Sequence, residues 1–463
     1  MTLFPKFQWA KLPIFWLLAI YLTVVFFTGG GSRPDTQSLI ILRPFAVVVC
    51  GIALLSLRRE HVQQYRTIFA LAAATFALVI AHLIPMPPDL WHQLPGRDLM
   101  IEVDRVSGTE AQWRPVALVP PLAWNAFYAL FVPLAVLLLG VQLTSEERYR
   151  LLNVVLALGL LSGIWGLLQV MSAPDGPLYL YRYTTNGAAV GLFANRNHQA
   201  VLLSCLFPIL AVFASFGVRS EQRRTVKKWL VLGGGAFLIP LILVTGSRAG
   251  IFTGILGLLF AFVLYRKPSQ SLVTKPSAKQ FNPFLIAIGF GVLALAAVTI
   301  VLSRAEAFRR LLTLDQREEL RWQVWEPIAQ MAMKYFPVGS GIGSFIQVYQ
   351  IDEPDALLNL TYVNRAHNDW LEVWVTAGVP GAVLLGIAVF CFLKASHTAF
   401  RTPAAGAHRV SYARLGAVIL FIFALASAVD YPLRTPSIAC LAVVALIWLR
   451  GEHARAIEKA GGD

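Results

Sequence analysis

The stretch AHNDWLEVWVTAGVPGAVLLGIAVFCFL, residues 366–393, sets a short polar cluster directly before an almost uninterrupted apolar segment. The apolar part is long enough to cross a bilayer as an α-helix, which needs about 20 residues. Similar runs recur along the whole chain, and they are continuous rather than alternating, which argues against a membrane β-barrel. The stretch therefore predicts a membrane-spanning helix with a histidine, His367, just before its first turn.

The composition indicates the same class. Of the 463 residues, 57% are hydrophobic and 14% are charged, and the mean hydropathy is +0.63. Soluble globular chains carry about 25% charged residues. The four cysteines each lie inside an apolar run, without metal-site spacing, so we expect packing residues rather than disulfides. We predict an all-α polytopic membrane protein.

About twelve spans are predicted, and no internal repeat of the kind found in transporters is visible. They lie near residues 12–28, 39–57, 67–85, 121–143, 150–171, 199–217, 229–246, 249–265, 283–302, 371–393, 414–429 and 437–449. The division expected is residues 1–302 with nine helices, 303–370 as a large outer loop, and 371–463 with three helices and a cytoplasmic tail. Part of the outer loop, after residue 303, has the apolar spacing of an amphipathic helix: Trp322, Trp325, Ile328, Ala329 and Ala332.

Loop charge sets the expected orientation. With the N-terminus in the cytoplasm, the basic short loops fall inside, as the positive-inside rule requires. All lysines except Lys334 then lie inside, so the outer bases are otherwise arginines. Arginine binds phosphate or carboxylate through a planar fork. An outer face selected for arginine suggests an anionic ligand, although contacts with lipid headgroups are the simpler explanation for part of the set.

Five polar islands fall on this predicted outer side, at span ends or in the long loop. They are NRNH at 195–198, GSR at 246–248, REELRWQVW at 317–325, RAHNDW at 365–370 and DYPLRTPS at 430–437. The hairpin around Arg248 is too short to clear the headgroups, so this charge is expected at membrane depth, where ionised side chains usually serve function. The glycine run after Pro337 is expected to be a tight turn that approaches other backbone closely.

These residue types fit one kind of chemistry. Arginines can stabilise a diphosphate leaving group, because charge that develops in the transition state meets preorganised donors. An imidazole suits deprotonation of an acceptor hydroxyl near neutral pH. An apolar body lets a lipid tail lie alongside. Together these features predict transfer of a glycan from a lipid diphosphate to a hydroxyl group.

At these motifs the chain resembles the O-antigen ligase and Wzy-type polymerase superfamily of bacterial membrane glycosyltransferases. The ligase pattern H-[NSQ]-x9-G-x-x-[GTY] is met by His367, Asn368, Gly378 and Gly381. A second pattern, R-x3-W…P-x-G-x-G-x3-F, is carried by Arg321, Trp325, Pro337, Gly339, Gly341 and Phe345. The NRN and GSR islands also look like the family, and the resemblance covers about residues 190–385.

The resemblance implies a GT-C-like helical fold in the bacterial inner membrane, with an active site that faces the periplasm. It implies an undecaprenyl-diphosphate-linked glycan donor, a lipid A–core or second lipid-linked glycan as acceptor, and inverting catalysis without metal or cofactor. By motif, His367 takes the place of the essential outer-loop histidine, and Arg248 and Arg321 take the diphosphate-binding positions. Supporting or fallback positions are Asn195, Arg196, His198, Arg317, Asn368, Asp430 and Arg434.

Several alternatives stay open. The HND cluster is also a good helix cap, with Asn368 or Asp369 as the capping side chain. His198, at a similar span end, is the fallback base. The acidic run 352–355 suits a divalent cation, although a solvated loop is the simpler interpretation. Ligase and polymerase share donor and chemistry, and a polyanion transporter is the alternative of another class.

Overall fold

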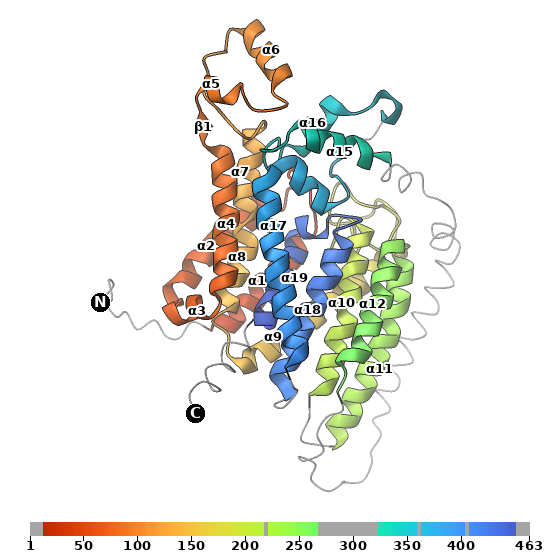
Figure 1. Ribbon diagram of the computed structural model, residues 1–463. Helices are drawn as coiled ribbons and strands as arrows, with labels where there is room; N and C mark the ends of the chain where they lie inside the picture. The colour runs from red at the N-terminus through yellow and green to blue at the C-terminus, as the bar shows by residue number, and fades with distance from the viewer. Residues whose placement is uncertain (1–12, 217–220, 267–322, 359–362, 403–406, 451–463) are drawn as a thin grey trace.

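The computed structural model describes residues 13–216, 221–266, 323–358, 363–402 and 407–450. These residues form a bundle of long helices with almost no strand (Figure 1). Among the described residues, six helices are long and apolar enough to cross a membrane, and five shorter apolar helices accompany them. The expected all-α, polytopic class is confirmed, whereas the GT-C likeness and the number of spans stay predictions.

The helices of the bundle follow the predicted spans closely. They are α1 (Ile14–Thr28), α2 (Leu39–Ser56), α4 (Arg66–Leu83), α7 (Pro120–Ala129), α8 (Phe131–Gly140), α9 (Ser145–Val170), α10 (Arg196–Ser215), α11 (Glu221–Val244), α12 (Arg248–Leu264), α17 (Asp369–Arg401), α18 (Ala407–Ala426) and α19 (Pro436–Arg450). Helices α7 and α8 together occupy the single span predicted at 121–143. The span predicted at 283–302 lies outside the described residues.

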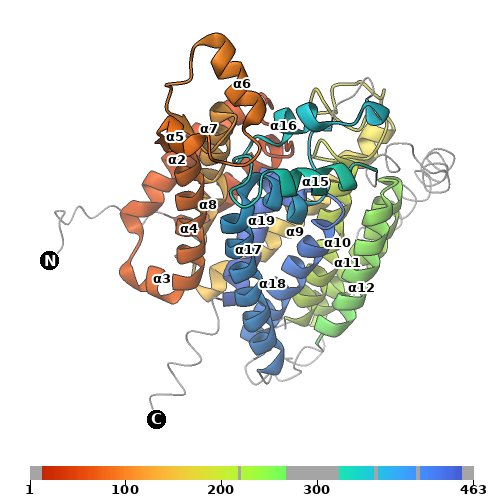
Figure 2. The same cartoon turned by 45° about the horizontal axis from the view of Figure 1, so that its top comes forward.

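One end of the bundle carries most of the irregular structure, and we call it the polar end (Figures 1 and 2). It holds the connections 29–38, 84–119, 171–195, 245–247, 323–358, 363–368 and 427–435. Its short elements are β1 (Pro85–Met86), α5 (Pro88–Trp91), α6 (Asp98–Ser107), β2 (Arg114–Pro115), α15 (Trp325–Lys334), α16 (Phe345–Asp352), η1 (Asp355–Leu357) and η2 (Pro432–Arg434). Strand β1 pairs with β2 in antiparallel fashion. The short α3 (Arg59–Gln64) lies at the opposite end.

Helix α10 forms the centre of the bundle, since every residue from Arg196 to Val212 is buried. Helix α12 packs against it through glycines. A Cβ added at Gly250 would overlap the Ala200 side chain, and one added at Gly257 would overlap the Ser204 carbonyl. Small residues of this kind let two membrane helices approach closely. The close approach sets the first turn of α12 beside the first turn of α10.

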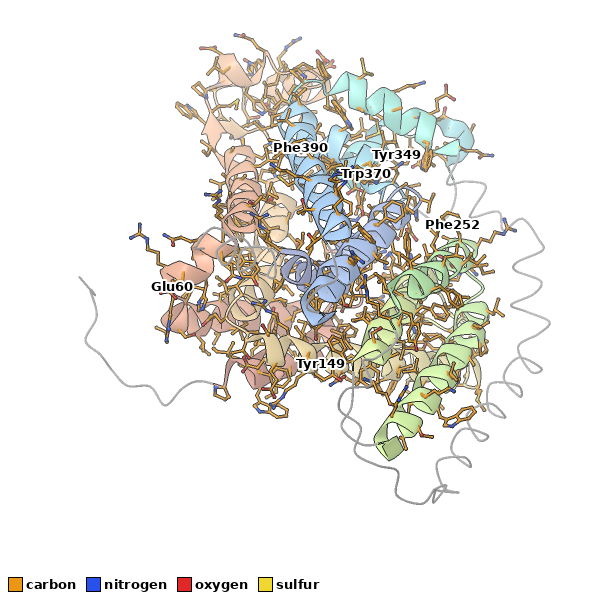
Figure 3. All side chains as sticks on the ribbon, turned by 60° about the horizontal axis from the view of Figure 1, so that its bottom comes forward. Glu60, Tyr149, Phe252, Tyr349, Trp370 and Phe390 are labelled. Carbon is orange, nitrogen blue, oxygen red and sulfur yellow. The ribbon has the colours of Figure 1, made fainter. Side chains whose placement is uncertain are left out.

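The outer surface of the bundle is apolar. Phe252 on α12 is 57% exposed and Phe390 on α17 is 66% exposed (Figure 3). Such side chains are normal where lipid, rather than water, covers a helix, because lipid tails are as apolar as the side chains themselves.

The predicted amphipathic helix is seen in part as α15. Ile328 is buried in a small cluster with Met331 and Tyr335, as the spacing predicts. Ala329 is exposed, so its place on the packed face was wrong: the buried row runs through Val324, Ile328, Met331 and Tyr335 instead. Trp322 lies outside the described residues.

Candidate functional site

Three polar islands cap the helices that begin at the polar end. The Asn195 side chain accepts a hydrogen bond from the Asn197 amide at 2.9 Å. Ser247 accepts from the Gly250 amide at 2.9 Å, at the start of α12. Asn368 accepts from the Leu371 amide at 3.1 Å, at the start of α17. Such caps satisfy amides that the first turn of a helix leaves without partners. The capping interpretation of Asn368 is confirmed.

Asp430 joins these islands. Its Oδ2 accepts from the Asn197 side-chain amide at 2.6 Å, and Oδ1 accepts from the Tyr431 amide at 3.0 Å. Nδ1 of His367 lies 3.4 Å from Oδ1 of Asp430. The Asp430 side chain is only 3% exposed. A buried carboxylate thus stands between the first turn of α10 and the histidine before α17.

His367 has the geometry of a constrained, accessible side chain. Its φ is +49°, the only positive φ of a non-glycine residue in the described part of the chain. A positive φ is strained for most residues other than glycine, and residues with such strained backbone are frequent at functional sites. The His367 side chain is 16% exposed, and its ring packs on Tyr431 with centroids 5.0 Å apart. The imidazole is therefore held in place and still reaches the surface.

His198 occupies a different environment. Its ring packs edge-on against Tyr431, with centroids 5.2 Å apart, so Tyr431 contacts both imidazoles. Nδ1 of His198 lies 2.9 Å from the Thr435 hydroxyl, and the residue is 1% exposed. A substrate hydroxyl therefore has easier access to His367 than to the fallback base.

A hydrogen-bonded chain connects Asp430 to α12. The Ser247 hydroxyl donates to Oδ1 of Asn197 at 2.8 Å, while the other atom of that amide donates to Asp430. Ser247 precedes Arg248, the half-buried first residue of α12. The candidate base His367 and the candidate phosphate-binding Arg248 are thus connected through three intervening side chains, those of Asp430, Asn197 and Ser247.

A partly buried ionic network, centred on the buried Glu372, holds the first turn of α17 in place. Arg434 donates to Asp369 at 2.9 Å and lies 3.5 Å from Glu372. Arg365 donates to Glu372 at 3.0 Å and to the Ser32 carbonyl at 3.1 Å. Burial lowers the pKa of Arg434, but the charges of Glu372 and Asp369 outweigh it, and the net effect raises that pKa. Arg434 therefore positions the α17 terminus through carboxylates.

Of the remaining predicted site residues, one is described in the structure and two are not. Arg196 is the buried first residue of α10 and lies beside the Asn195 cap. Arg317 and Arg321 lie outside the described residues. In the acidic run, Asp352 accepts from Lys334 at 2.6 Å, and the described residues contain no cluster of three potential metal-ligating side chains.

A family model described as O-antigen ligase matches residues 233–386. Residues 233–386 are thus similar to the O-antigen ligase family, and we call this segment the O-antigen ligase domain. The resemblance to the O-antigen ligase and Wzy-type superfamily is thereby confirmed over about a third of the chain. A comparison with curated proteins finds no match.

The O-antigen ligase domain contains both halves of an unusual helix break. Within α17, Gly378 has φ +56° and ψ −150°, which is not helical. Two residues later Pro380 lacks an amide proton, so the Thr376 carbonyl has no helical partner. The Gly341 amide donates to that carbonyl at 2.9 Å. The glycine run therefore supplies the hydrogen-bond donor that Pro380 cannot give to the Thr376 carbonyl.

Two more backbone hydrogen bonds join the glycine run to the break in α17. The Val379 amide donates to the Pro337 carbonyl at 2.8 Å, in place of the Val375 carbonyl of its own helix. The Val375 carbonyl accepts instead from the Ser340 amide at 2.8 Å. The two sequence patterns of the O-antigen ligase domain are thus two sides of one backbone junction, which explains the predicted tight turn.

The junction has no room for side chains. A Cβ added at Gly378 would overlap the Pro337 carbonyl oxygen, and one added at Gly341 would overlap the backbone of Ala117. Arg97 closes the junction from the 84–119 connection by donating to the Gly339 carbonyl at 3.1 Å. Burial lowers the pKa of Arg97 to about 10, so this guanidinium stays charged at neutral pH.

We expect Gly378→Ala to destabilise the protein by at least about 1–3 kcal/mol, the usual strain of a disfavoured backbone conformation. Thermal unfolding of the purified protein in detergent measures this. Gly386→Ala is the matched control in the same helix, because an added Cβ there meets no atom within 4 Å. Alanine favours a helix interior over glycine, so Gly386→Ala should keep or raise Tm. Equal Tm values for both variants would contradict the junction.

Sequence reasoning missed several members of the site. Tyr431, Glu372 and Arg365 were not singled out, although each lies next to or within a predicted island. Their signal was their position: polar or aromatic side chains at span ends beside the motifs of the O-antigen ligase domain. The bond between Ser247 and Asn197 had no sequence signal, since it joins residues fifty positions apart.

Proposed function

We propose that this membrane enzyme transfers a glycan from an undecaprenyl-diphosphate donor to an acceptor hydroxyl at the polar end, in the manner of an O-antigen ligase. The O-antigen ligase domain supports an enzyme of the ligase or polymerase kind. The observation that carries the proposal is the strained, accessible His367 beside the buried carboxylate of Asp430, linked by hydrogen bonds to the helix start that bears Arg248.

In the proposed reaction His367 removes the proton from the acceptor hydroxyl, and the oxygen attacks the anomeric carbon of the donor. The bond from that carbon to the diphosphate oxygen breaks, and the configuration inverts. Arg248 and Arg321 stabilise the charge on the departing diphosphate. Asp430 orients the imidazole and stabilises its cation, as a carboxylate does in a catalytic triad. The reaction as proposed needs no metal.

A reconstituted assay tests the proposal and separates its alternatives. Purified protein in vesicles receives a lipid-linked glycan with either a lipid A–core acceptor or a second lipid-linked glycan, in buffer with EDTA. Transfer to core lipid supports a ligase, and chain extension supports a Wzy-type polymerase. Failure with both acceptors would refute the proposed function. The hydrogen-bonded groups of the candidate site, Asp430, Asn197 and Ser247, lie together at one end of the helices, which favours an enzyme over a polyanion transporter.

The polar end is proposed to face the periplasm, and cysteine labelling tests this. Asp355→Cys, at an exposed position in η1, should react with an impermeant maleimide in intact spheroplasts. Arg59→Cys, exposed in α3 at the other end, should react only after permeabilisation. The native cysteines give little background, because three are buried and Cys391 lies in an apolar helix. The reverse pattern would place the site in the cytoplasm.

A further inference from the structure

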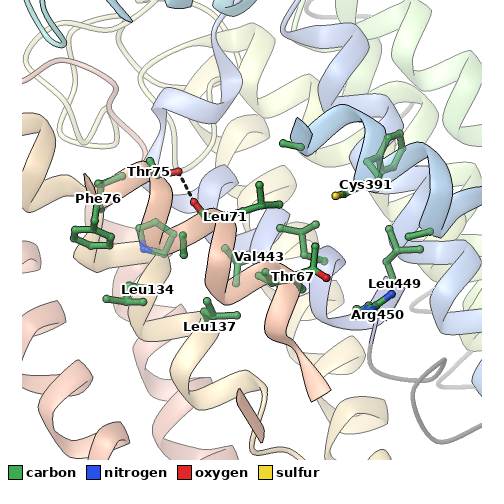
Figure 4. Close-up of a pocket in the computed structure, with 18 residues that line it drawn as sticks. Thr67, Leu71, Thr75, Phe76, Leu134, Leu137, Cys391, Val443, Leu449 and Arg450 are labelled. Carbon is green, nitrogen blue, oxygen red and sulfur yellow. Dashed lines mark hydrogen bonds between the residues drawn. The ribbon is translucent and has the colours of Figure 1, made fainter. Parts of the chain in front are cut away.

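An apolar groove lies between α4 and α17, far from the site described above (Figure 4). Its volume is about 330 Å³, and α8 and α19 form its other walls. The wall of α4 includes Leu71 and Phe76, and the wall of α17 includes Cys391 and Ala395. The groove therefore runs along the half of α17 that is remote from His367.

Protein covers helix α17 only partly along this half, where Phe392 and Ala395 pack against a small apolar cluster. None of its residues between Gly381 and Ala399 is buried, although all of them are described. Phe390 and Leu393 on this stretch are 66% and 57% exposed. A helix that carries a candidate base at its first turn thus rests against a groove over much of its length.

Among the described residues that line the groove, one has a charged side chain, and it lies at one end of the groove. Arg450 is the last residue of α19, and Thr67 lies in the first turn of α4, so both mark the end opposite the polar end. Thr75 keeps its hydroxyl on the Leu71 carbonyl of its own helix at 2.9 Å (Figure 4). In the described part of the chain, the buried Nε of Arg450 has no hydrogen-bond partner.

We propose that this groove binds an acyl chain of an anionic phospholipid, whose phosphate contacts Arg450. The lipid belongs to the leaflet opposite the polar end, the cytoplasmic leaflet in the predicted orientation. Its apolar tail matches the walls, and a guanidinium is a good phosphate ligand. The polyprenyl tail of a donor is a poorer match, because a diphosphate near His367 would leave Arg450 without an anion. The bound lipid fills the gap beside α17 and supports that helix.

A photocrosslinking experiment tests this inference, which does not rest on the proposed transferase function. The full-length protein is reconstituted with phosphatidylglycerol that carries a diazirine in one acyl chain, and adducts are located by peptide mass spectrometry. We expect adducts on the α17 segment 388–395. Arg450→Gln should reduce them about fivefold, the effect of one basic side chain at an anionic surface. Ala395→Phe, which narrows the groove, should also reduce them.

The control variant is Arg266→Gln, which removes a charge just after α12, at the helix end opposite the polar end, from a residue that does not line the groove. It should label like the wild type. Equal labelling by the matching phosphatidylcholine would overturn the proposal, as would stronger labelling by a photoactive polyprenyl diphosphate. Wild-type labelling of both Arg450→Gln and Ala395→Phe would overturn it as well. Thermal unfolding of each variant verifies that it is folded.

Discussion

Replacing His367 with alanine is expected to lower glycan transfer by about 10²- to 10⁴-fold, the usual contribution of a positioned general base. Affinity for the lipid-linked donor should stay near wild type, because the imidazole acts on the acceptor hydroxyl. The structure supports this division of roles: His367 contacts Asp430 and Tyr431 and reaches the surface. Initial transfer rates and donor binding, both measured on the purified variant, test the two halves of the expectation.

Asp430→Asn should reproduce most of this loss without removing the imidazole. The carboxylate accepts from Asn197 and lies 3.4 Å from Nδ1 of His367. An amide would present a donor to at least one of these groups, and the imidazole would lose both its orientation and its counter-charge. Asp35→Asn is the matched control, since Asp35 also lies at the polar end and pairs with Arg33 on the surface.

The outcome that contradicts this assignment is clear. If His367→Ala transfers glycan at the wild-type rate, the histidine only precedes the Asn368 cap, and another group activates the acceptor. His198 would then be tested first, although its 1% exposure requires a movement of Tyr431 or Thr435 before a hydroxyl can approach it. A loss of rate in Asp35→Asn equal to that in Asp430→Asn would likewise remove the special role of Asp430.

The helices were predictable from sequence because an apolar run of sufficient length has few other ways to satisfy its backbone in lipid. Their ends were harder to predict. The span expected at 67–85 is helical over Arg66–Leu83, and the one expected at 371–393 continues to Arg401. Local hydropathy does not report such ends, because capping side chains and tertiary contacts decide where the helical hydrogen bonds stop.

The site was predictable in its composition but not in its connections. The islands around Asn195, Ser247 and His367 were all expected at one side, and the structure brings their side chains into one network. Only a weak signal in the sequence indicated that Asp430 belongs to the site. The residue lies in an irregular turn between two helices, and its spacing from the other motifs matches no defined pattern. Its central place depends on how α10, α17 and α19 pack, which a single sequence does not state.

The glycine junction shows the same limit. A tight turn after Pro337 was expected, and so was a need for backbone approach. The partner was not, because Gly378 lies in what appears in sequence as an ordinary apolar span. A glycine followed two residues later by a proline does weaken a helix locally. Only the fold shows that Gly341 and Ser340 supply the two amides that such a break requires.

Arg248 should behave differently from His367 in the same assays. If its guanidinium holds the donor diphosphate, Arg248→Ala loses donor affinity and transfer together, with a rate loss of about 10²- to 10³-fold for one transition-state contact. Arg248→Lys should recover little, because an ammonium cannot make the two parallel bonds of a guanidinium. The position favours this role: Arg248 begins α12, where helix amides and the helix dipole also favour an anion.

A conservative exchange elsewhere provides the comparison for Arg248→Lys. Arg105 is exposed on α6 at the polar end, and the Arg105→Lys variant should transfer glycan at the wild-type rate. Unfolding of the variants in detergent checks that α12 still packs on α10, where Ser247 bonds to Asn197 and to Gly250 in the wild type. If Arg248→Lys binds donor and transfers like the wild type, a simple positive charge suffices and the bidentate assignment is wrong. If Arg248→Ala also does so, the diphosphate binds elsewhere, and Arg196 at the neighbouring helix start becomes the residue to test.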